Sequence, residues 1–460
     1  MTARSVRDYI EAAQAGDIDY ADFAAKALAE AARKNKDFNL FVSMATELDF
    51  SPARLTGLPL TVKDCICVAG MQSAAGSRIL EGYVPPFDAT SVRRAKESGA
   101  AVLGKTQQDE FGFGTFSVNS GYAIPKNPLD PARSCGGSSG GAAAALAALD
   151  VPHLAMAEST GGSISCPAAF CGVVGLTPTY GLVSRYGLID YANSLDKIGT
   201  MGKRVYDAAL LLSLIAGHDR HDATSLNREQ NDYTKHAQAV KLKGLRLAVP
   251  KEYFGNLEAN VEKKVRHAIE LLEQEGATCE EVSLPGTPFA LASYYIIATS
   301  EASTNLSRFC GMRYGLHLPL HGNFNEYFSG VRSRGFGAEA KRRIMLGTFA
   351  RMSGYRQAYY AKALQVRTLI IREFKALFKN YHAIAAPTMP IEPPKFSDIK
   401  KLSPSEHYQM DTLTVPANLA GLPHLSVPVR PKMPIGLHLI GDHLQEATLI
   451  EIAATYEGMQ

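Results

Sequence analysis

Two glycine- and serine-rich clusters, Gly136–Gly141 and Thr160–Ser163, lie close together in this chain. The small apolar segment Ala142–Leu149 joins them. Glycine lets the backbone approach other groups closely, and serine supplies a hydroxyl that can act as a nucleophile or a proton relay. Consecutive backbone N–H groups in such turns can bind a developing oxyanion. The clusters therefore constrain the chain to a fold that supports a reactive site, and they indicate acyl transfer.

Lys63 is a candidate base for that chemistry because it follows the apolar run Leu58–Val62. A lysine at the end of a buried strand is poorly solvated, which disfavours its charged form. Two serines, a lysine and a glycine-rich loop can perform acyl transfer without a histidine. Taken singly, the residues have structural alternatives: Lys63 at a surface strand end, Ser138 in a flexible loop, and Ser163 as a helix N-cap.

Longer stretches of the chain resemble the amidase signature family, and the resemblance covers nearly the whole chain. These stretches are Gly57–Asp64, Gly136–Gly141, Gly161–Pro167, Cys171–Pro178 and Ser194–Gly199. The resemblance implies an α/β fold with one large mixed β-sheet covered by helices on both faces, an α/β/α sandwich. It also implies two parts, an N-terminal helical segment at 1–50 packed on the core and an amidase signature domain at 51–460.

The same resemblance implies roles for individual residues. Enzymes of this family use a nucleophilic serine, a second serine preceded by a cis peptide bond, and a lysine. By position, Ser163 is the nucleophile, Ser138 the cis-serine and Lys63 the terminal base. The backbone amides expected to form the oxyanion hole are those around Thr160, Gly161 and Gly162.

Local patterns predict several elements. Ser5 can cap a first helix that Gly16 ends, and an alanine-rich second helix follows at 19–35. A strand at 245–250, a helix at 262–275 and a strand at 277–284 form a βαβ unit, so part of the sheet is expected to be parallel. The other predictions are strands at 56–62, 100–103 and 381–386, a helix at 91–98, a helix with its exit loop over 142–157, and a long helical region at 342–378.

The second half of the chain resembles one branch of the family, the A subunits of aspartyl/glutamyl-tRNA amidotransferases, and the compact length resembles its archaeal members. The similar stretches are Ser293–Phe309, Gly335–Gly347 and Val415–Pro423. By this resemblance Tyr294, Arg343 and Asp411 recognise free glutamine. An arginine suits the α-carboxylate of glutamine, and an aspartate suits its α-ammonium. The alternative for Arg343 is a basic residue on a solvated helix face.

In that branch the A subunit releases ammonia from glutamine. A partner B subunit binds the tRNA and activates the misacylated Glu or Asp with ATP, and a small C subunit braces the pair. The resemblance therefore implies B and C subunits as partners, and misacylated tRNA reached through the B subunit. ATP and magnesium are used by the complex, and no cofactor belongs to this chain.

Composition agrees with a protein of this kind. A formal net charge of +3 over 460 residues is too mild to indicate a large basic surface for nucleic acid. The seven cysteines are scattered and odd in number, which indicates free thiols in a reducing compartment. Their spacing does not match a zinc site, so no metal is expected. No apolar run reaches the roughly 20 residues that span a membrane, and the N-terminus lacks a signal core, so we expect a cytoplasmic protein.

Two other motifs compete with this interpretation. Gly99–Thr106 matches the phosphate-binding P-loop letter for letter, but that loop follows a strand and opens a helix. Here Gly99 follows a predicted helix, and Ala100–Leu103 suits a buried strand. Gly136–Gly140 matches the nucleophile elbow of α/β-hydrolases, which needs a preceding strand and a later acid and histidine. The preceding Asn127–Arg133 is loop-like, so both motifs are disfavoured.

The chain also departs from the family pattern near the second cluster. Relatives commonly have an Asp before its threonine and an Arg after its isoleucine, where this chain has Ser159 and Ser165, with Glu158 nearby. The segment between the clusters is one residue longer than usual, and Cys135 replaces a frequent Pro. Two alternatives stay open. One is a stand-alone amidase acting on small amides, and the other is a catalytically silent structural subunit, against which the intact triad argues.

Overall fold

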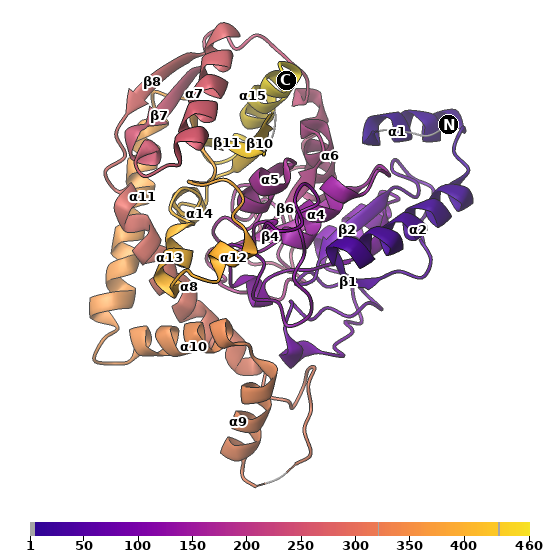
Figure 1. The fold of residues 1–460 in the computed structure, drawn as a ribbon, viewed down its shortest axis with the longest axis vertical. Helices are drawn as coiled ribbons and strands as arrows, with labels where there is room; N and C mark the ends of the chain where they lie inside the picture. The colour runs from indigo at the N-terminus through magenta and orange to yellow at the C-terminus, as the bar shows by residue number, and fades with distance from the viewer. Residues whose placement is uncertain (1–4, 321, 431–432) are drawn as a thin grey trace.

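The centre of the computed structural model is one mixed β-sheet; the structure describes residues 5–320, 322–430 and 433–460. Within this part of the chain eleven strands follow one another in the order β1-β3-β2-β4-β6-β5-β10-β11-β9-β7-β8 (Figure 1). They are β1 Phe41–Met44, β2 Pro59–Lys63, β3 Ala101–Thr106, β4 Leu154–Ser159, β5 Val174–Thr177, β6 Lys197–Gly202, β7 Arg246–Pro250, β8 Thr278–Val282, β9 Ala383–Pro387, β10 His424–Val429 and β11 Ile435–Gly441. The predicted α/β fold with one large mixed sheet is confirmed.

Helices cover both faces of the sheet. One group contains α4 and α5, which pack on each other. The other contains α6, α7 and α15, in which α15 packs on both of the others. Both groups contact the central strands, one from each face of the sheet. The helices are α1 Val6–Ala15, α2 Tyr20–Phe38, α3 Thr90–Glu97, α4 Gly140–Ala148, α5 Ser165–Cys171, α6 Val205–Ile215, α7 Ala259–Gln274, α8 Thr287–Asn305, α9 Phe324–Gly335, α10 Ala338–Arg351, α11 Lys362–Leu377, α12 Phe396–Ile399, α13 Pro404–Gln409, α14 Val415–Leu419 and α15 Glu446–Gly458.

The first N-terminal helix begins and ends as its sequence predicts, whereas α2 begins as predicted but continues past Asn35 to Phe38. The Ser5 side chain accepts a hydrogen bond from the Asp8 amide, and Gly16 ends α1 in the left-handed conformation with φ of 78°. The segment before residue 50 also supplies β1, which pairs antiparallel with β3. The Tyr9 hydroxyl donates to the Thr56 carbonyl at 2.8 Å. The division of the chain at residue 50 stays a prediction.

The predicted βαβ unit is confirmed, because β7 pairs in parallel with β8 and α7 connects them. The helix and strand expected near 91–98 and 100–103 are α3 and β3. Residues Val261, Val265, Ala268, Ile269 and Leu272 of α7 are buried, as the helical spacing of its apolar residues indicates.

Two longer helical predictions are wrong in part. The segment expected to hold a helix and its exit loop over 142–157 has a helix that ends at Ala148 and then a loop, but from Leu154 on it belongs to the buried strand β4. The region expected to be helical over 342–378 is interrupted after Arg351, and one π-helical turn at Gln357–Ala361 precedes α11. The first prediction failed at β4 because a strand that is buried on both faces is a continuous run of apolar residues. Such a run does not differ from a buried helix in its sequence pattern.

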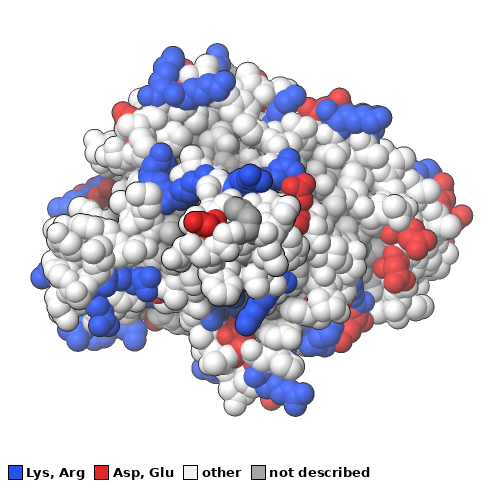
Figure 2. Space-filling model, turned by 90° about the horizontal axis from the view of Figure 1, so that it is seen from below, with Lys and Arg blue, Asp and Glu red and all other residues white. Residues whose placement is uncertain are grey.

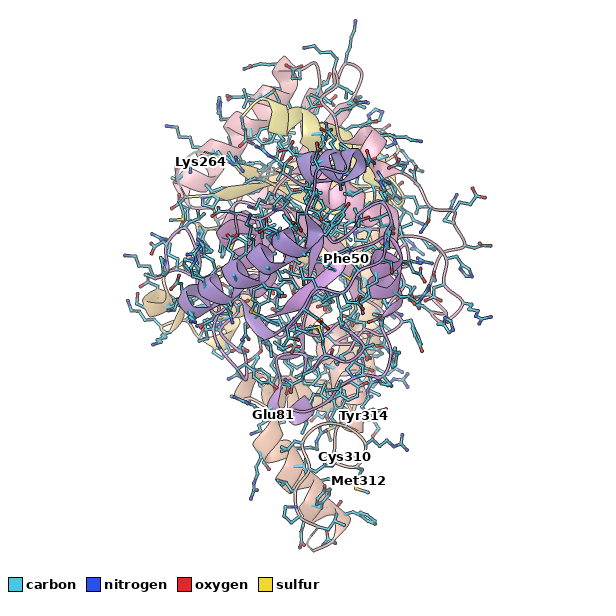
Figure 3. The ribbon with its side chains drawn as sticks, turned by 90° about the vertical axis from the view of Figure 1, so that its right-hand side faces the viewer. Phe50, Glu81, Lys264, Cys310, Met312 and Tyr314 are labelled. Atoms are coloured by element: carbon cyan, nitrogen blue, oxygen red, sulfur yellow. The ribbon has the colours of Figure 1, made fainter. Side chains whose placement is uncertain are left out.

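One helical arm projects from the body of the molecule. It contains α9, which lies at the lower end in Figure 1. In Figure 3, Glu81 and Tyr314 lie where this arm leaves the body, and Cys310 and Met312 lie beside it. All seven cysteines are free thiols. Within the described chain, no helix is long and apolar enough to cross a membrane, and no group of three or more potential ligand side chains could hold a metal.

Candidate active site

Lys63 lies at the end of β2, between the parallel strands β3 and β4. Every residue of β2 is buried, so the lysine side chain runs through the core and not along a surface. Its Nζ donates to Ser138 Oγ at 2.7 Å, to the Glu158 carbonyl at 2.9 Å and to Glu158 Oε2 at 2.8 Å. The surface alternative for Lys63 is therefore wrong, and the lysine contacts the first serine cluster directly.

Ser138 stands in a tight buried turn before α4. The Gly137–Ser138 peptide bond is cis, as the resemblance to the amidase signature family implies. A Cβ on Gly137 would overlap the Asp109 carboxylate and come within 2.7 Å of the Ser117 amide nitrogen, so the turn requires glycine there. The Asp109 carboxylate accepts hydrogen bonds from the Ser117 and Asn119 amides. These contacts fix the Ser138 hydroxyl against Lys63, which excludes a flexible loop.

Ser163 belongs to the turn that connects β4 to α5. The Ser139 amide donates to the Ser163 carbonyl at 3.2 Å, so the structure brings the two clusters together. The Ser163 amide donates to Ser159 Oγ at 3.1 Å, which holds the turn. Ser163 is 6% exposed. Its hydroxyl oxygen makes no hydrogen bond to another described residue and is accessible from outside the protein. It does not cap α5, whose N-cap is Ile164 without a side-chain bond.

The backbone around Gly161 and Gly162 can bind an anion. The amides of Thr160, Gly161 and Gly162 donate no hydrogen bond to any other residue in the described ranges, so they remain available. A Cβ on Gly161 would lie 2.9 Å from the Tyr294 hydroxyl oxygen. Glycine at this position therefore lets Tyr294 approach the turn that carries Ser163.

Arg343 is a buried residue of α10 with a side-chain exposure of 3%. Its Nε donates to Glu339 Oε1 at 2.8 Å and its Nη1 donates to the Tyr191 hydroxyl at 2.7 Å. The guanidinium lies over four aromatic rings, those of Phe113, Tyr191, Tyr295 and Tyr408, at 5.1 to 5.7 Å from their centroids. Its Nη2 has no partner in the described part of the chain and is not enclosed. The solvated-face alternative for Arg343 is therefore wrong.

Asp411 lies far along the chain but reaches the same region. Its Oδ2 accepts from the Tyr295 hydroxyl at 2.6 Å and its Oδ1 accepts from Thr115 Oγ1 at 2.9 Å. Burial raises the pKa of Asp411, and these two hydrogen bonds act in the opposite direction. The rings of Tyr294 and Tyr295 meet edge to face at 5.0 Å. Tyr294, which borders Gly161, thus connects the Ser163 turn to Asp411 through its neighbour in sequence.

Sequence reasoning missed a group of acidic and hydroxyl side chains behind Lys63. Thr160 Oγ1 lies 2.8 Å from Glu158 Oε1 and 2.8 Å from Asp196 Oδ1. Asp196 Oδ2 accepts from the Tyr191 and Ala192 amides at 2.9 Å. Burial, followed by the charge of Glu158, raises the pKa of Asp196 well above its ordinary range. The nearest sequence indication was the family departure at Ser159, beside which Glu158 was noted.

The second departure, Ser165, contacts one member of a pair of buried histidines. Its Oγ lies 3.0 Å from His424 Nδ1, and His438 Nε2 lies 3.0 Å from the same nitrogen. Burial, helped by the nearby Lys197, lowers the pKa of His438 to about 3 and that of His424 well below its ordinary value. Both imidazoles are therefore neutral at physiological pH, and neither contacts Ser138 or Ser163.

The two competing motifs do not form the sites that they resemble. Lys105 of the P-loop pattern is a buried β3 residue that donates to Ser73 Oγ at 2.6 Å, and no helix begins at Thr106. The nucleophile-elbow pattern at Ser138 follows a loop, and the partner of its hydroxyl is Lys63, not a histidine.

Comparisons with known proteins identify the family of this chain. A family model described as Amidase matches residues 4–450. The A subunit of the glutamyl-tRNA(Gln) amidotransferase of Halothermothrix orenii is 48% identical over 408 residues, which cover 88% of this chain and 85% of that protein. The protein of the same name from Symbiobacterium thermophilum is 44% identical over 461 residues, which cover 96% of this chain and 94% of that protein.

A solved structure shows the same fold. The crystal structure of the A subunit of the Thermotoga maritima glutamyl-tRNA(Gln) amidotransferase matches with a TM-score of 0.84 at 37% identity. The match covers 98% of this chain and 94% of that chain.

Proposed function

Since this chain belongs to the amidase family, we propose that it is the glutamine-hydrolysing subunit of a tRNA-dependent amidotransferase. Its ammonia converts Glu-tRNA(Gln) to Gln-tRNA(Gln), Asp-tRNA(Asn) to Asn-tRNA(Asn), or both. The observation that carries the proposal is the 2.7 Å hydrogen bond from Lys63 to Ser138, in a turn that is itself bonded to the Ser163 backbone.

The proposed reaction is acyl transfer through Ser163. Ser163 Oγ attacks the side-chain amide carbon of glutamine, while its proton passes to Ser138 and the Ser138 proton passes to Lys63. The amides of Gly161 and Gly162 bind the oxyanion that forms on the substrate, an effect of roughly 3–4 kcal/mol per donor in other hydrolases. The relayed proton goes to the departing ammonia, and water then resolves the acyl-enzyme.

The proposed glutamine contacts follow from charge. Arg343 offers its unpartnered Nη2 to the α-carboxylate, while Glu339 and Tyr191 hold the rest of the guanidinium in place. Asp411, held by Tyr295 and Thr115, suits the α-ammonium. Tyr294 borders the Gly161 turn and packs edge to face on Tyr295, whose hydroxyl binds Asp411.

Partners supply the remaining steps in this proposal. B and C subunits complete the enzyme in the cytoplasm, and the B subunit binds the misacylated tRNA and uses ATP and magnesium. On the face seen in Figure 2, basic and acidic groups are scattered between broad uncharged areas, which suits a protein partner better than direct RNA binding. The apolar side chains of Met345, Leu346 and Phe349 are 72%, 46% and 42% exposed on α10, as expected of a subunit that docks with others.

The test is release of ammonia from glutamine by the chain with its B and C subunits. We expect Ser163→Ala to lower turnover by at least ~10³-fold with the fold intact, because only a hydroxyl is removed. Ser213→Ala is the matched control, since it removes a buried serine hydroxyl of α6 far from the triad. Near-normal glutamine hydrolysis by Ser163→Ala would contradict the assignment.

A further inference from the structure

The Lys63 ammonium is not isolated at the end of the proposed relay. Its Nζ forms an ion pair with Glu158 Oε2 at 2.8 Å, and the two side chains are 0% and 4% exposed. A carboxylate at this distance stabilises the ammonium form. A protonated lysine has no lone pair, so it can accept a proton from Ser138 only if it gives one up. Glu158 Oε2 is in position to receive that proton.

The hydrogens around Glu158 can be assigned by counting donors. Thr160 Oγ1 carries one hydrogen but lies 2.8 Å from both Glu158 Oε1 and Asp196 Oδ1. One of these two carboxyl groups must therefore carry a proton and donate it. Glu158 is ion-paired with Lys63 through Oε2, so Asp196 is the protonated group. Its Oδ2 already accepts two backbone N–H groups, which leaves Oδ1 to carry the proton. Asp196 then donates to Thr160, and Thr160 donates to Glu158.

Building on the proposed function, we propose that Glu158 is the terminal proton acceptor of this site, positioned by Thr160 and a protonated Asp196. As Ser163 Oγ bonds to the amide carbon, its proton passes to Ser138, the Ser138 proton to Lys63 Nζ, and a Lys63 proton to Glu158 Oε2. Lys63 ends the step as the ammonium with which it began. The negative charge moves from Glu158 to the substrate oxygen, and the same path returns the proton to the leaving nitrogen.

The surroundings of Glu158 leave few other groups to titrate. Lys63 faces it from β2, Cys65 from the loop after β2, and Asp196 from the segment before β6. Burial raises the pKa of the Cys65 thiol well above its ordinary value, so this group is neutral. Beyond them, Asp109 faces Lys63, and Asp190 and Arg185 face Asp196. The raised pKa of Asp196 agrees with its role as the protonated member.

The pH dependence of kcat/KM for glutamine tests the assignment with Glu158→Gln in the complete complex. In the parent enzyme, the activity lost at acid pH then reports protonation of a carboxylate. We expect Glu158→Gln to lower kcat by ~10²-fold or more at neutral pH, a general-base effect. The remaining activity needs neutral Lys63, so we expect the acid limb of the profile to move to higher pH.

The opposite shift would overturn the proposal. If Lys63 is itself the last acceptor, removal of the neighbouring anion destabilises the ammonium. The acid limb then moves to lower pH, and the rate at neutral pH holds or rises. Glu158→Asp keeps a carboxylate, so its acid limb stays near that of the parent under either assignment, and its rate is the informative quantity. A shorter side chain moves the carboxylate away from Lys63, so we expect a reduced kcat if Glu158 is the acceptor. If Glu158→Gln does not fold, an unchanged kcat in Glu158→Asp contradicts the proposal.

Two further variants complete the experiment. Asp196→Asn presents N–H hydrogens to Thr160, as the protonated acid does, so we expect the acid limb of its pH profile to stay in place. A shift of this limb would contradict the assignment of a protonated Asp196. Glu457→Gln makes the same chemical change at a carboxylate that accepts the Val205 amide, away from Lys63, and controls for general effects. If Ser163→Ala loses activity but the acid limb of Glu158→Gln moves to lower pH, the role of Glu158 is rejected and the proposed function stands. An active Ser163→Ala rejects the proposed function.

Discussion

At the scale of single residues, the charged side chains of the candidate site are held in place by hydrogen bonds to other side chains of the same chain, without any ligand. Arg343 is paired with Glu339 and surrounded by aromatic rings, and Asp411 is held by two hydroxyl groups. Such groups lose little conformational freedom on binding, because the fold has already ordered them. In the glutamine-binding role that we propose, this arrangement favours a zwitterionic ligand over a simple amide.

Replacement of Arg343 tests this recognition. We expect Arg343→Ala to raise KM for glutamine by about 30-fold or more, since truncating one partner of a buried ion pair costs roughly 2–5 kcal/mol. KM for a simple aliphatic amide without an α-carboxylate should change far less. Arg342→Ala is the matched control, because Arg342 contacts the same Glu339 carboxylate but is 42% exposed. Equal losses for both substrates would show that Arg343 is structural and would favour a stand-alone amidase.

Sequence reasoning identified the residues that motifs carry and missed those that only the fold brings together. Lys63, Ser138 and Ser163 stand in glycine-rich or strand-end patterns whose chemistry is readable from residue type. Glu158 and Asp196 meet through Thr160 because β4 and β6 pair antiparallel, with Glu158 opposite Ile198. The local sequence pattern does not show which strands pair with each other. The meeting of these acidic side chains was therefore not predicted.

At the scale of elements, the predictions succeeded where periodicity and a glycine terminator coincide. Two predicted units show this. The amphipathic helix α3 is followed by Gly99 and then β3, and the amphipathic helix α7, which lies between β7 and β8, is followed by Gly276. β4 and β11 are buried along their whole length and show no alternation of polar and apolar residues. Such strands cannot be told from helix segments by period alone.

The crossing of α8 and α10 is an element-scale feature that can be tested. Gly347 of α10 packs against α8, where a Cβ would overlap the Thr299 carbonyl. We expect Gly347→Ala to destabilise the protein by roughly 1–3 kcal/mol, the usual cost of overpacking. It should also raise KM for glutamine, because α10 carries Arg343 and α8 carries Tyr294 and Tyr295.

Urea unfolding followed by circular dichroism measures the loss of stability. Gly354→Ala is the control, because a Cβ there would meet no heavy atom within 4 Å. A Gly347→Ala protein as stable as the parent would mean that the two helices can separate without cost.

At the scale of the whole molecule, the proposed reaction needs other chains. The P-loop pattern of this chain is a buried strand and so offers no phosphate-binding loop. We expect the purified chain to be a weak glutaminase at best. Co-expressed B and C subunits should bind it through an interface of roughly 1,200–2,000 Å² or more, and should raise its activity.

Size-exclusion chromatography of the co-expressed proteins, followed by a transamidation assay with ATP, glutamine and misacylated tRNA, checks this expectation. The complex carrying Ser163→Ala is the control; it should assemble normally and use added ammonia but not glutamine. A lone chain that forms Gln-tRNA or Asn-tRNA from ATP and glutamine would contradict the need for partners.

The strand order also has a consequence for synthesis on the ribosome. The hairpin of β10 and β11 lies between β5 and β9, so the last strands to be made join the two halves of the sheet. Chains emerge from the N-terminus, and pairings between distant segments form late. Lys63 and Ser138 leave the ribosome long before Asp411 can reach Thr115 and Tyr295. If the proposed roles hold, a nascent chain carries Ser163 before Asp411 is in place, and we expect it not to hydrolyse glutamine until translation ends.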